Sequence, residues 1–237
     1  MNEKVTVYIG DAGKGKMPTI SVCTYCMKRL GQAKQSVPHL LSQVKPGDEV
    51  VFVDYSCPEG AGGWAKSLNN SQLKVISVPG RSWWNPAHAH NCAMRASAGD
   101  IVVFMDIDNM LPNGLLERIR GMPRGQFYAY LPGDNLSGFC CIWRDEFLKV
   151  NGYEEALAGW GYEDTSLYRA LDLAGVKRVD MKDVKPLVLD PNRQVRVLEP
   201  VMGDPWRQNW AITDVLRQRH RFRNNVNRDW GLGWVKA

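Results

Sequence analysis

Short apolar runs rich in β-branched residues alternate with segments of helical periodicity in the first half of the chain. The runs predict strands at 19–24, 49–54, 74–78 and 101–105, and a helix is predicted at 28–41. A second helix should begin at Asn85-Pro86, because Asn is favoured at the N-cap and Pro at the first helical position. This order predicts an α/β fold with a mostly parallel sheet and helices on both sides.

The pattern changes after Gln126. Strands are predicted at 127–131, 138–143 and 176–181, and helices at 145–150, at 165–173 and near 210–221. No internal repeat or low-complexity linker divides the chain. We therefore expect one domain over residues 1–190, in two halves that join near residue 108, followed by a C-terminal extension over 191–237 that packs on it.

Composition indicates an ordinary globular chain. The 237 residues are 44% hydrophobic and 23% charged, and no apolar run approaches the ~20 residues that a membrane helix needs. The N-terminal sequence lacks the pattern of a signal peptide, so we expect a cytoplasmic protein. Cys23-x-x-Cys26 has zinc spacing but no second pair to complete a site, and the six cysteines are interpreted as free thiols.

The net charge of +5 is concentrated in the C-terminal extension. From residue 193 onward nine basic residues face four acidic ones, and tryptophans are interspersed among them. Such a mixture suits nucleic acid, an anionic glycan or an acidic membrane surface. The alternative is a solvated basic helix whose tryptophans pack on the domain.

A glycine- and lysine-rich segment near the N-terminus imitates a phosphate-binding loop. Residues 10–16 match the first seven positions of a P-loop, but Met17 stands where Ser or Thr should bind magnesium, and Pro18 follows where a helix should begin. A flexible basic turn is therefore the favoured interpretation, and a nucleotide hydrolase is a third and weaker hypothesis for the function.

Two acidic motifs carry the candidate chemistry. Asp106-x-Asp108 follows the wholly apolar run 101–105, where its carboxylates suit Mg²⁺ or Mn²⁺. Further along, Trp160 lies between two glycines and precedes Glu163-Asp164, a combination that offers a stacking face for a sugar and a carboxylate base. An acidic loop end and an acidic helix start are the structural alternatives.

Several motifs in order resemble those of the nucleotide-sugar glycosyltransferases of the GT-A fold. The first half is similar to the family 2 group, and the second half to the catalytic domains of β1,4-galactosyltransferases and chondroitin polymerases. The resemblance covers roughly residues 19–190. It rests on Ser21–Tyr25, Val51–Ser56, Asn91, Ala98–Asp108, Trp84–Ala87, Gly138–Cys141, Phe147–Tyr153 and Gly159–Asp164.

The resemblance implies a donor site in the first half, which would then be the nucleotide-binding half. Thr24 and Asp54 would contact the uracil and ribose of a UDP-sugar, with Arg81 near the nucleotide. Asp106 would lie by the ribose, and Asp108 would bind Mn²⁺ or Mg²⁺ on the diphosphate.

In the second half, the acceptor-binding half, the resemblance implies the catalytic groups. Asp164 would be the base that takes the proton of the acceptor hydroxyl, and Glu163 would hydrogen-bond the acceptor. Trp160 would form a platform between the donor and acceptor sugars. With one base opposite the leaving group and no separate candidate nucleophile, displacement with inversion is expected.

Three positions depart from the family pattern. Tyr55 stands where many relatives have an acidic residue, and Tyr162 replaces a common glycine. The histidine that usually completes the metal site is missing, and Asp190 falls where it is expected, as a metal ligand or as a surface loop residue. The acceptor implied is a glycan, or a hydroxymethylated base in DNA bound through the basic extension. The alternative function is a GT-A-like module that binds nucleic acid or glycan without catalysis.

Overall fold

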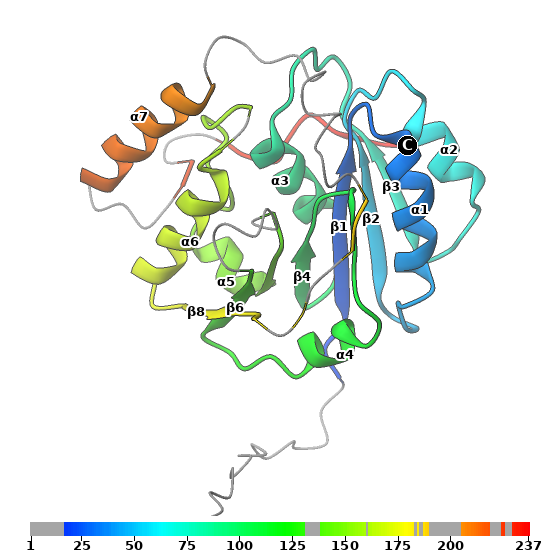
Figure 1. The fold of residues 1–237 in the computed structure, drawn as a ribbon, viewed down its shortest axis with the longest axis horizontal. Helices are drawn as coiled ribbons and strands as arrows, with labels where there is room; N and C mark the ends of the chain where they lie inside the picture. The colour runs from blue at the N-terminus through cyan, green and yellow to red at the C-terminus, as the bar shows by residue number, and fades with distance from the viewer. Residues whose placement is uncertain are drawn as a thin grey trace, which may run out of the picture.

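The structure is a computed structural model, shown in Figure 1. It describes residues 17–130, 138–159, 161–182, 184, 187–189, 205–218, 224–225 and 229–237. The P-loop-like segment, Trp160, Asp190 and most of the arginine-rich run 217–223 lie outside these residues. Among the helices of the described part, none combines the length and the apolar character needed to cross a membrane.

Eight strands form one mixed sheet in the order β10-β3-β2-β1-β4-β7-β6-β8. Strands β1 to β4 run parallel, whereas β7 is antiparallel to both β4 and β6, and β10 is antiparallel to β3. The predicted mostly parallel α/β sheet is confirmed. The strands are β1 Ile20–Cys26, β2 Glu49–Asp54, β3 Leu73–Ser77, β4 Ile101–Phe104, β6 Gln126–Ala129, β7 Cys140–Trp143, β8 Lys177–Asp180 and β10 Val235–Lys236.

Helices cover both faces of the sheet. Side chains of α1, α2 and α4 pack in the core of one face, and those of α3, α5 and α6 in the core of the other. Helix α7 lies on the α6 side of the molecule (Figure 1). The helices are α1 Leu30–Leu41, α2 Ala61–Ser67, α3 Pro86–Ala96, α4 Leu115–Arg120, α5 Arg144–Lys149, α6 Glu163–Leu173 and α7 Pro205–Gln218.

The strand order reverses between the central strands β1 and β4, which is where the ligand crevice of such sheets is expected. From β1 the chain builds β2 and β3 on one side, and it then crosses to β4 on the other side of β1. Ligands bind outside the carboxyl ends of strands at such a point, where the order reverses. Tyr25 lies at the end of β1, and the Asp106–Asp108 motif directly follows β4.

The final residues of the chain complete the sheet. Strand β10 pairs with β3, and Trp230 is buried in the core, with the Arg95 guanidinium 4.3 Å from its ring centroid. Gly231 lies so close to the backbone of Asn91 that an added Cβ would come within 2.7 Å of its carbonyl oxygen. This part of the extension therefore packs into the fold.

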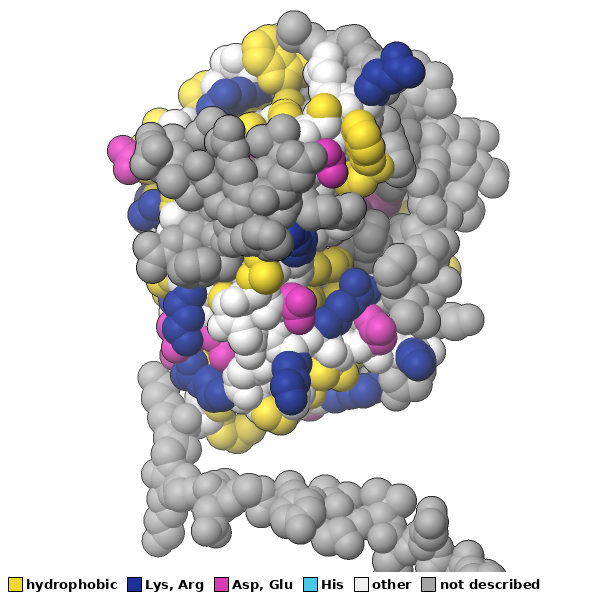
Figure 2. Space-filling view, turned by 90° about the vertical axis from the view of Figure 1, so that its left-hand side faces the viewer, with side chains coloured by type: hydrophobic (Ala, Val, Ile, Leu, Met, Phe, Trp, Pro, Cys, Tyr) yellow, Lys and Arg dark blue, Asp and Glu magenta, His cyan; other side chains and the backbone are white. Residues whose placement is uncertain are grey.

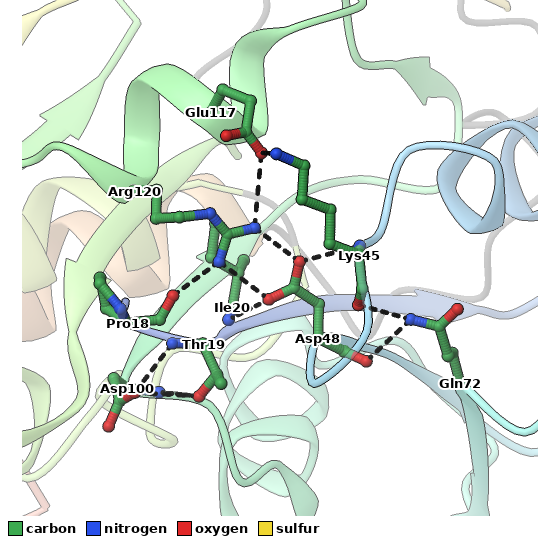
Figure 3. A network of polar contacts seen from close by, with 9 residues as sticks. All are labelled: Pro18, Thr19, Ile20, Lys45, Asp48, Gln72, Asp100, Glu117 and Arg120. Atoms are coloured by element: carbon green, nitrogen blue, oxygen red, sulfur yellow. Dashed lines mark hydrogen bonds and ion pairs between the residues drawn. The ribbon is translucent and has the colours of Figure 1, made fainter. Parts of the chain in front are cut away.

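A buried ion pair holds the amino ends of the central strands, at the edge opposite the crevice. The Arg120 guanidinium at the end of α4 contacts both carboxylate oxygens of Asp48, at 3.1 and 2.7 Å, and donates to the Pro18 carbonyl (Figure 3). Asp48 also accepts from the Ile20 backbone N–H at 2.9 Å. Burial opposes ionisation of Asp48, but Arg120 and the backbone donors outweigh it and lower its pKa.

Replacing Arg120 by Met should destabilise the fold strongly, because it leaves the Asp48 carboxylate buried without its partner. We expect a loss of about 3–5 kcal/mol in the free energy of unfolding, measured by urea denaturation at pH 7. The matched control is Lys45→Met, which breaks an exposed pair with Glu117 and should cost at most ~1 kcal/mol.

The contribution of Asp48 to the free energy of unfolding should depend on pH. Since its folded pKa lies below the ordinary value of 3.8, its stabilisation is present above that pH and is lost as the pH falls through the lowered pKa. Arg120→Met should flatten this acid dependence. Equal costs for Arg120→Met and Lys45→Met would contradict the buried pair.

Candidate active site

Asp106 is held at the crevice by groups from both halves of the chain. Its carboxylate accepts a hydrogen bond from the Tyr25 hydroxyl. Gly138, before β7, packs against the same carboxylate, and an added Cβ there would come within 2.5 Å of Oδ2. Burial raises the pKa of the Tyr25 hydroxyl well above 10, and the charge of Asp106 raises it further, so the hydroxyl stays protonated and donates. Asp106 is thus fixed in one orientation.

Asp108 pairs with an arginine that precedes α1. The Arg29 guanidinium lies 2.8 Å from Asp108 Oδ2, and both side chains are at least nine-tenths buried. A buried carboxylate requires a cation or several hydrogen bonds, because desolvation penalises its charge. Arg29 supplies that cation here, close to where the resemblance implies a divalent ion.

Glu163 and Asp164 form the first turn of α6, and both are buried. Burial raises the pKa of the Asp164 carboxyl well above 3.8, and the negative charges of Glu163 and then Asp106 raise it further, while Arg178 opposes the shift. Within the described residues, Asp164 Oδ1 has no hydrogen-bond partner. The same acids influence the Tyr25 hydroxyl, so Asp106 and the α6 pair share one site.

Two of the residues that are predicted to bind the sugar donor, Thr24 and Asp54, lie near the carboxyl ends of β1 and β2. Asp54 Oδ1 accepts from the Cys57 N–H at 2.9 Å, and the other oxygen lies against Gly62 of α2, where a side chain would not fit. Thr24 is fully buried and alternates with Tyr25, so it points to the opposite face of the sheet. Their contact with a nucleotide stays a prediction.

Arg81 lies beside a buried histidine. Its Nη2 is 3.3 Å from His88 Nε2, which is 2.8 Å from the Leu232 carbonyl oxygen, and His88 Nδ1 is 3.0 Å from the Tyr55 hydroxyl. Desolvation lowers the pKa of His88. Tyr55 is therefore a buried partner of His88, and the C-terminal segment contacts His88, beside the Arg81 that is predicted to lie near the nucleotide.

The backbone brings the neighbourhood of Asp190 to Asp108. Strand β5 (Asn109–Met110) pairs with β9 (Leu187–Val188), and the Leu189 N–H donates to the Asp108 carbonyl at 2.7 Å. Asp190 itself lies outside the described residues.

Solved glycosyltransferases share this arrangement of strands and helices. A mannosyltransferase from Pyrobaculum calidifontis, in complex with GDP-Man and Mn²⁺, superposes with a TM-score of 0.63 over 88% of this chain and 73% of that one, at 17% identity. The catalytic domain of Drosophila β1,4-galactosyltransferase 7, in complex with xylobiose, gives a TM-score of 0.56 over 83% and 79%, at 15% identity. At these identities the likeness establishes the GT-A fold.

Two family models match successive parts of the sequence. The model described as glycosyl transferase family 2 matches residues 21–122, and the model described as N-terminal domain of galactosyltransferase matches residues 117–187. Together the two models cover residues 21–187, and the fold is that of the GT-A glycosyltransferases. The resemblance recognised from several motifs in order over roughly residues 19–190 is thereby confirmed.

Curated relatives match only a part of the chain. β-1,4-galactosyltransferase 5 of Danio rerio is 29% identical over 115 residues, 44% of this chain and 30% of the relative. Chondroitin sulfate synthase 3 of Homo sapiens is 28% identical over 72 residues, 28% of this chain and 8% of the relative. The chain thus spans less than a third of the length of these relatives.

Three residues of the GT-A site were not identified from sequence. Tyr25 lies in a motif used for recognition, but nothing local shows that it bonds Asp106, 81 residues away. Arg29 pairs across 79 residues, and Gly138 begins a motif of the resemblance, but only the structure shows its contact with Asp106. The available signals were these two motifs and the basic character of the residue that precedes α1.

Tyr162 lies in the left-handed region at the start of α6, with φ of 71°, a conformation that favours glycine. Tyr162→Gly should change the free energy of unfolding by less than about 1 kcal/mol, because relief of strain offsets the added backbone entropy. If Tyr162 contacts the acceptor, the acceptor KM should rise while the donor KM stays constant. Steady-state kinetics and urea unfolding measure both, and an unchanged acceptor KM would exclude the contact.

Proposed function

We propose that this chain transfers a sugar from a nucleotide sugar, with UDP as the first candidate nucleotide, to a hydroxyl of an acceptor, with inversion and with the help of Mn²⁺ or Mg²⁺. The observation that carries the proposal is that Asp106, Glu163 and Asp164 are all buried, with Asp106 accepting from the Tyr25 hydroxyl and with burial and the charges of Glu163 and Asp106 raising the pKa of Asp164. Buried acids are costly unless they are paired or hydrogen-bonded, and acids with raised pKa values are typical of functional sites.

Asp164 is the proposed base. Its carboxylate takes the proton of the acceptor hydroxyl while the acceptor oxygen bonds to the anomeric carbon and the bond from that carbon to the nucleotide diphosphate breaks. Its raised pKa makes it a stronger base than a solvated carboxylate, which suits removal of a proton from an alcohol. Because one base acts opposite the leaving group, the configuration at the anomeric carbon inverts. Glu163, its neighbour in the same turn, is the proposed anchor for the acceptor.

Asp108 and Asp190 are the proposed ligands of the divalent ion. Carboxylates suit such an ion, and the hydrogen bond between Leu189 and Asp108 supports the inclusion of Asp190. Among the described residues, no group of three or more His, Cys, Asp or Glu side chains is placed to hold a metal. When bound, the ion would neutralise charge on the departing diphosphate. The Arg29 guanidinium, 2.8 Å from Asp108 Oδ2, also balances the charge of this carboxylate.

UDP is placed first among donors because the curated relatives include β-1,4-galactosyltransferases and because TarS from S. aureus, which has a similar fold, was solved in complex with UDP-GlcNAc. That structure has a TM-score of 0.63 at 14% identity, over 83% of this chain and 66% of that one. Thr24, Asp54, Arg81 and Trp160 remain the residues proposed to bind the donor.

A glycan is the first proposed acceptor and a hydroxymethylated base in DNA the second. The face on the α6 and α7 side shows Lys and Arg side chains interspersed with Asp and Glu among its described residues, rather than one basic patch (Figure 2). Such a mixed surface favours a glycan over a long polyanion. The arginine-rich run 217–223 lies mostly outside the described residues, so hydroxymethylated DNA is also tested as an acceptor.

The proposal is tested by incubating the protein with a panel of UDP- and GDP-sugars and Mn²⁺, without acceptor and then with glycans or hydroxymethylated DNA. We expect slow release of nucleotide diphosphate from one class of donor and faster release with the correct acceptor. NMR of the product should show the anomeric configuration inverted. Retention of configuration would overturn the mechanism. Absence of turnover with every donor and acceptor, in a folded sample, would favour the non-catalytic binding module.

A further inference from the structure

Asn209 of helix α7 is buried and joins the C-terminal extension to the loop before α6. It is 2% exposed, and its side-chain amide donates to the Ala158 carbonyl at 3.1 Å and to the Gly161 carbonyl at 2.9 Å. An asparagine amide carries two N–H donors, so it can supply both bonds. The same loop also contacts the segment before α3, where the Gly159 N–H donates to the Trp84 carbonyl at 2.9 Å. The loop is thus tied to α7 and to the segment before α3.

The start of α6 is conformationally demanding. Gly161 and Tyr162 have φ of 99° and 71°, and the residue before the helix is a tyrosine rather than one of the short polar residues that cap helices. A non-glycine residue in this region is strained and persists only where its surroundings hold it. The bonds from Asn209 lie directly before this turn, so they restrict the conformations that it can adopt.

We propose that Asn209 is a positioning residue for the catalytic step: by holding the Ala158 and Gly161 carbonyls it fixes the turn from which Glu163 and Asp164 project. The inference rests on the proposed function, in which Asp164 is the base. It gives the extension a role in the reaction that needs no contact between the extension and a ligand.

The fold of α6 has other anchors, so Asn209 variants are expected to fold. Ser166, one turn into the helix, bonds to Asn224 at 3.4 Å, and Asn224 donates to the Gly152 carbonyl at 2.6 Å. Leu167 and Leu171 are fully buried in the core. Loss of Asn209 should therefore disturb the position of the first turn while the rest of the helix stays packed.

The test compares Asn209→Ala and Asn209→Asp with Gln208→Ala, an exposed neighbour on the same helix. The aspartate keeps the shape but replaces the two donors with a charge that faces two carbonyl oxygens. Both Asn209 variants should lower kcat about 10- to 100-fold, since small displacements of a catalytic group have such effects, with the donor KM within about twofold of wild type. Asn209→Gln, which restores the amide, should recover part of kcat.

Two further readouts separate positioning from general loss of stability. Looser packing hydrates Asp164, so the acid limb of the kcat–pH profile should move to lower pH in Asn209→Ala. Hydrogen exchange at the Ser166 amide, which bonds the Tyr162 carbonyl at 2.8 Å, should accelerate in Asn209→Ala and stay unchanged in Gln208→Ala. This exchange measurement needs no activity. If Asn209→Ala has the same exchange rate and the same kcat as the wild type, the role of Asn209 is overturned but the proposed function is not. A wild-type protein that is inactive and binds no donor would overturn the proposed function.

Discussion

Replacement of Asp164 by Asn is expected to lower kcat for sugar transfer by about 10²–10⁴-fold, with donor affinity retained. The amide has the shape of the acid but cannot accept the proton of the acceptor hydroxyl. Transfer is measured with the donor and acceptor found in the screen, and donor affinity by calorimetry. The matched control is Asp172→Asn, an exposed acid near the other end of α6, which should keep wild-type kcat. Activity of Asp164→Asn within tenfold of wild type would remove Asp164 from the role of base.

The same substitution should stabilise the protein at neutral and alkaline pH. Because the folded pKa of Asp164 is raised above 3.8, its stability contribution is complete below the unfolded pKa and is lost as the pH rises through the folded pKa. Thermal unfolding should therefore give Asp164→Asn a higher Tm than wild type at high pH and the same Tm near pH 3–4. The activity of the wild type should rise through the same folded pKa, since only the carboxylate accepts a proton.

Asp108→Asn is expected to abolish the response to Mn²⁺ and to lower transfer on the order of 10³-fold. Stabilisation of charge by a bound metal amounts to several kcal/mol, and each 1.4 kcal/mol is a factor of ten. The measurement is the shift of Tm by donor with and without Mn²⁺, together with the rate of transfer.

The variant Arg29→Met separates the structural role of Asp108, its ion pair with Arg29, from its proposed role as a metal ligand. Both substitutions break the ion pair of 2.8 Å and should weaken the fold, but only Asp108→Asn removes the carboxylate. We expect Arg29→Met to keep the Tm shift with Mn²⁺ and donor, whereas Asp108→Asn loses it. A Mn²⁺ response that is equal in Asp108→Asn and wild type would contradict the proposed metal site.

Local patterns were sufficient to predict most elements of the fold. The apolar run at 101–105 becomes β4, and Asn85 caps α3 by accepting from the His88 N–H at 2.9 Å. Helix α2 was missed because its sequence contains two glycines, one of which is required by the contact with Asp54. Strand β10 was missed because two residues carry too little pattern to be recognised as a strand.

The partners of the site could not be predicted, because they depend on contacts between distant segments. Tyr25 with Asp106, Arg29 with Asp108 and Asn209 with Gly161 are each separated by 48 to 81 residues. The sequence does identify the carboxylates themselves, since they follow recognisable strands and motifs. The roles given to them, to Thr24 and to Asp54 stay predictions.

The motif at 159–164 was ambiguous between an acidic helix start and an active site, and the structure shows why both interpretations arise. Glu163 and Asp164 occupy the first turn of α6, where the helix dipole favours acids. Yet burial raises the pKa of Asp164, so the site as a whole disfavours its charge. A residue present only to stabilise the helix would remain exposed and keep its charge, which supports a chemical role for Asp164.

The central claim is tested most directly by calorimetric titration of the panel of UDP- and GDP-sugars into the wild-type protein with Mn²⁺. The account predicts saturable binding of at least one donor, with Kd in the ~1 μM–1 mM range typical of enzyme substrates, and its loss with a chelator or in Asp108→Ala. Absence of binding for every nucleotide sugar in the panel would contradict it.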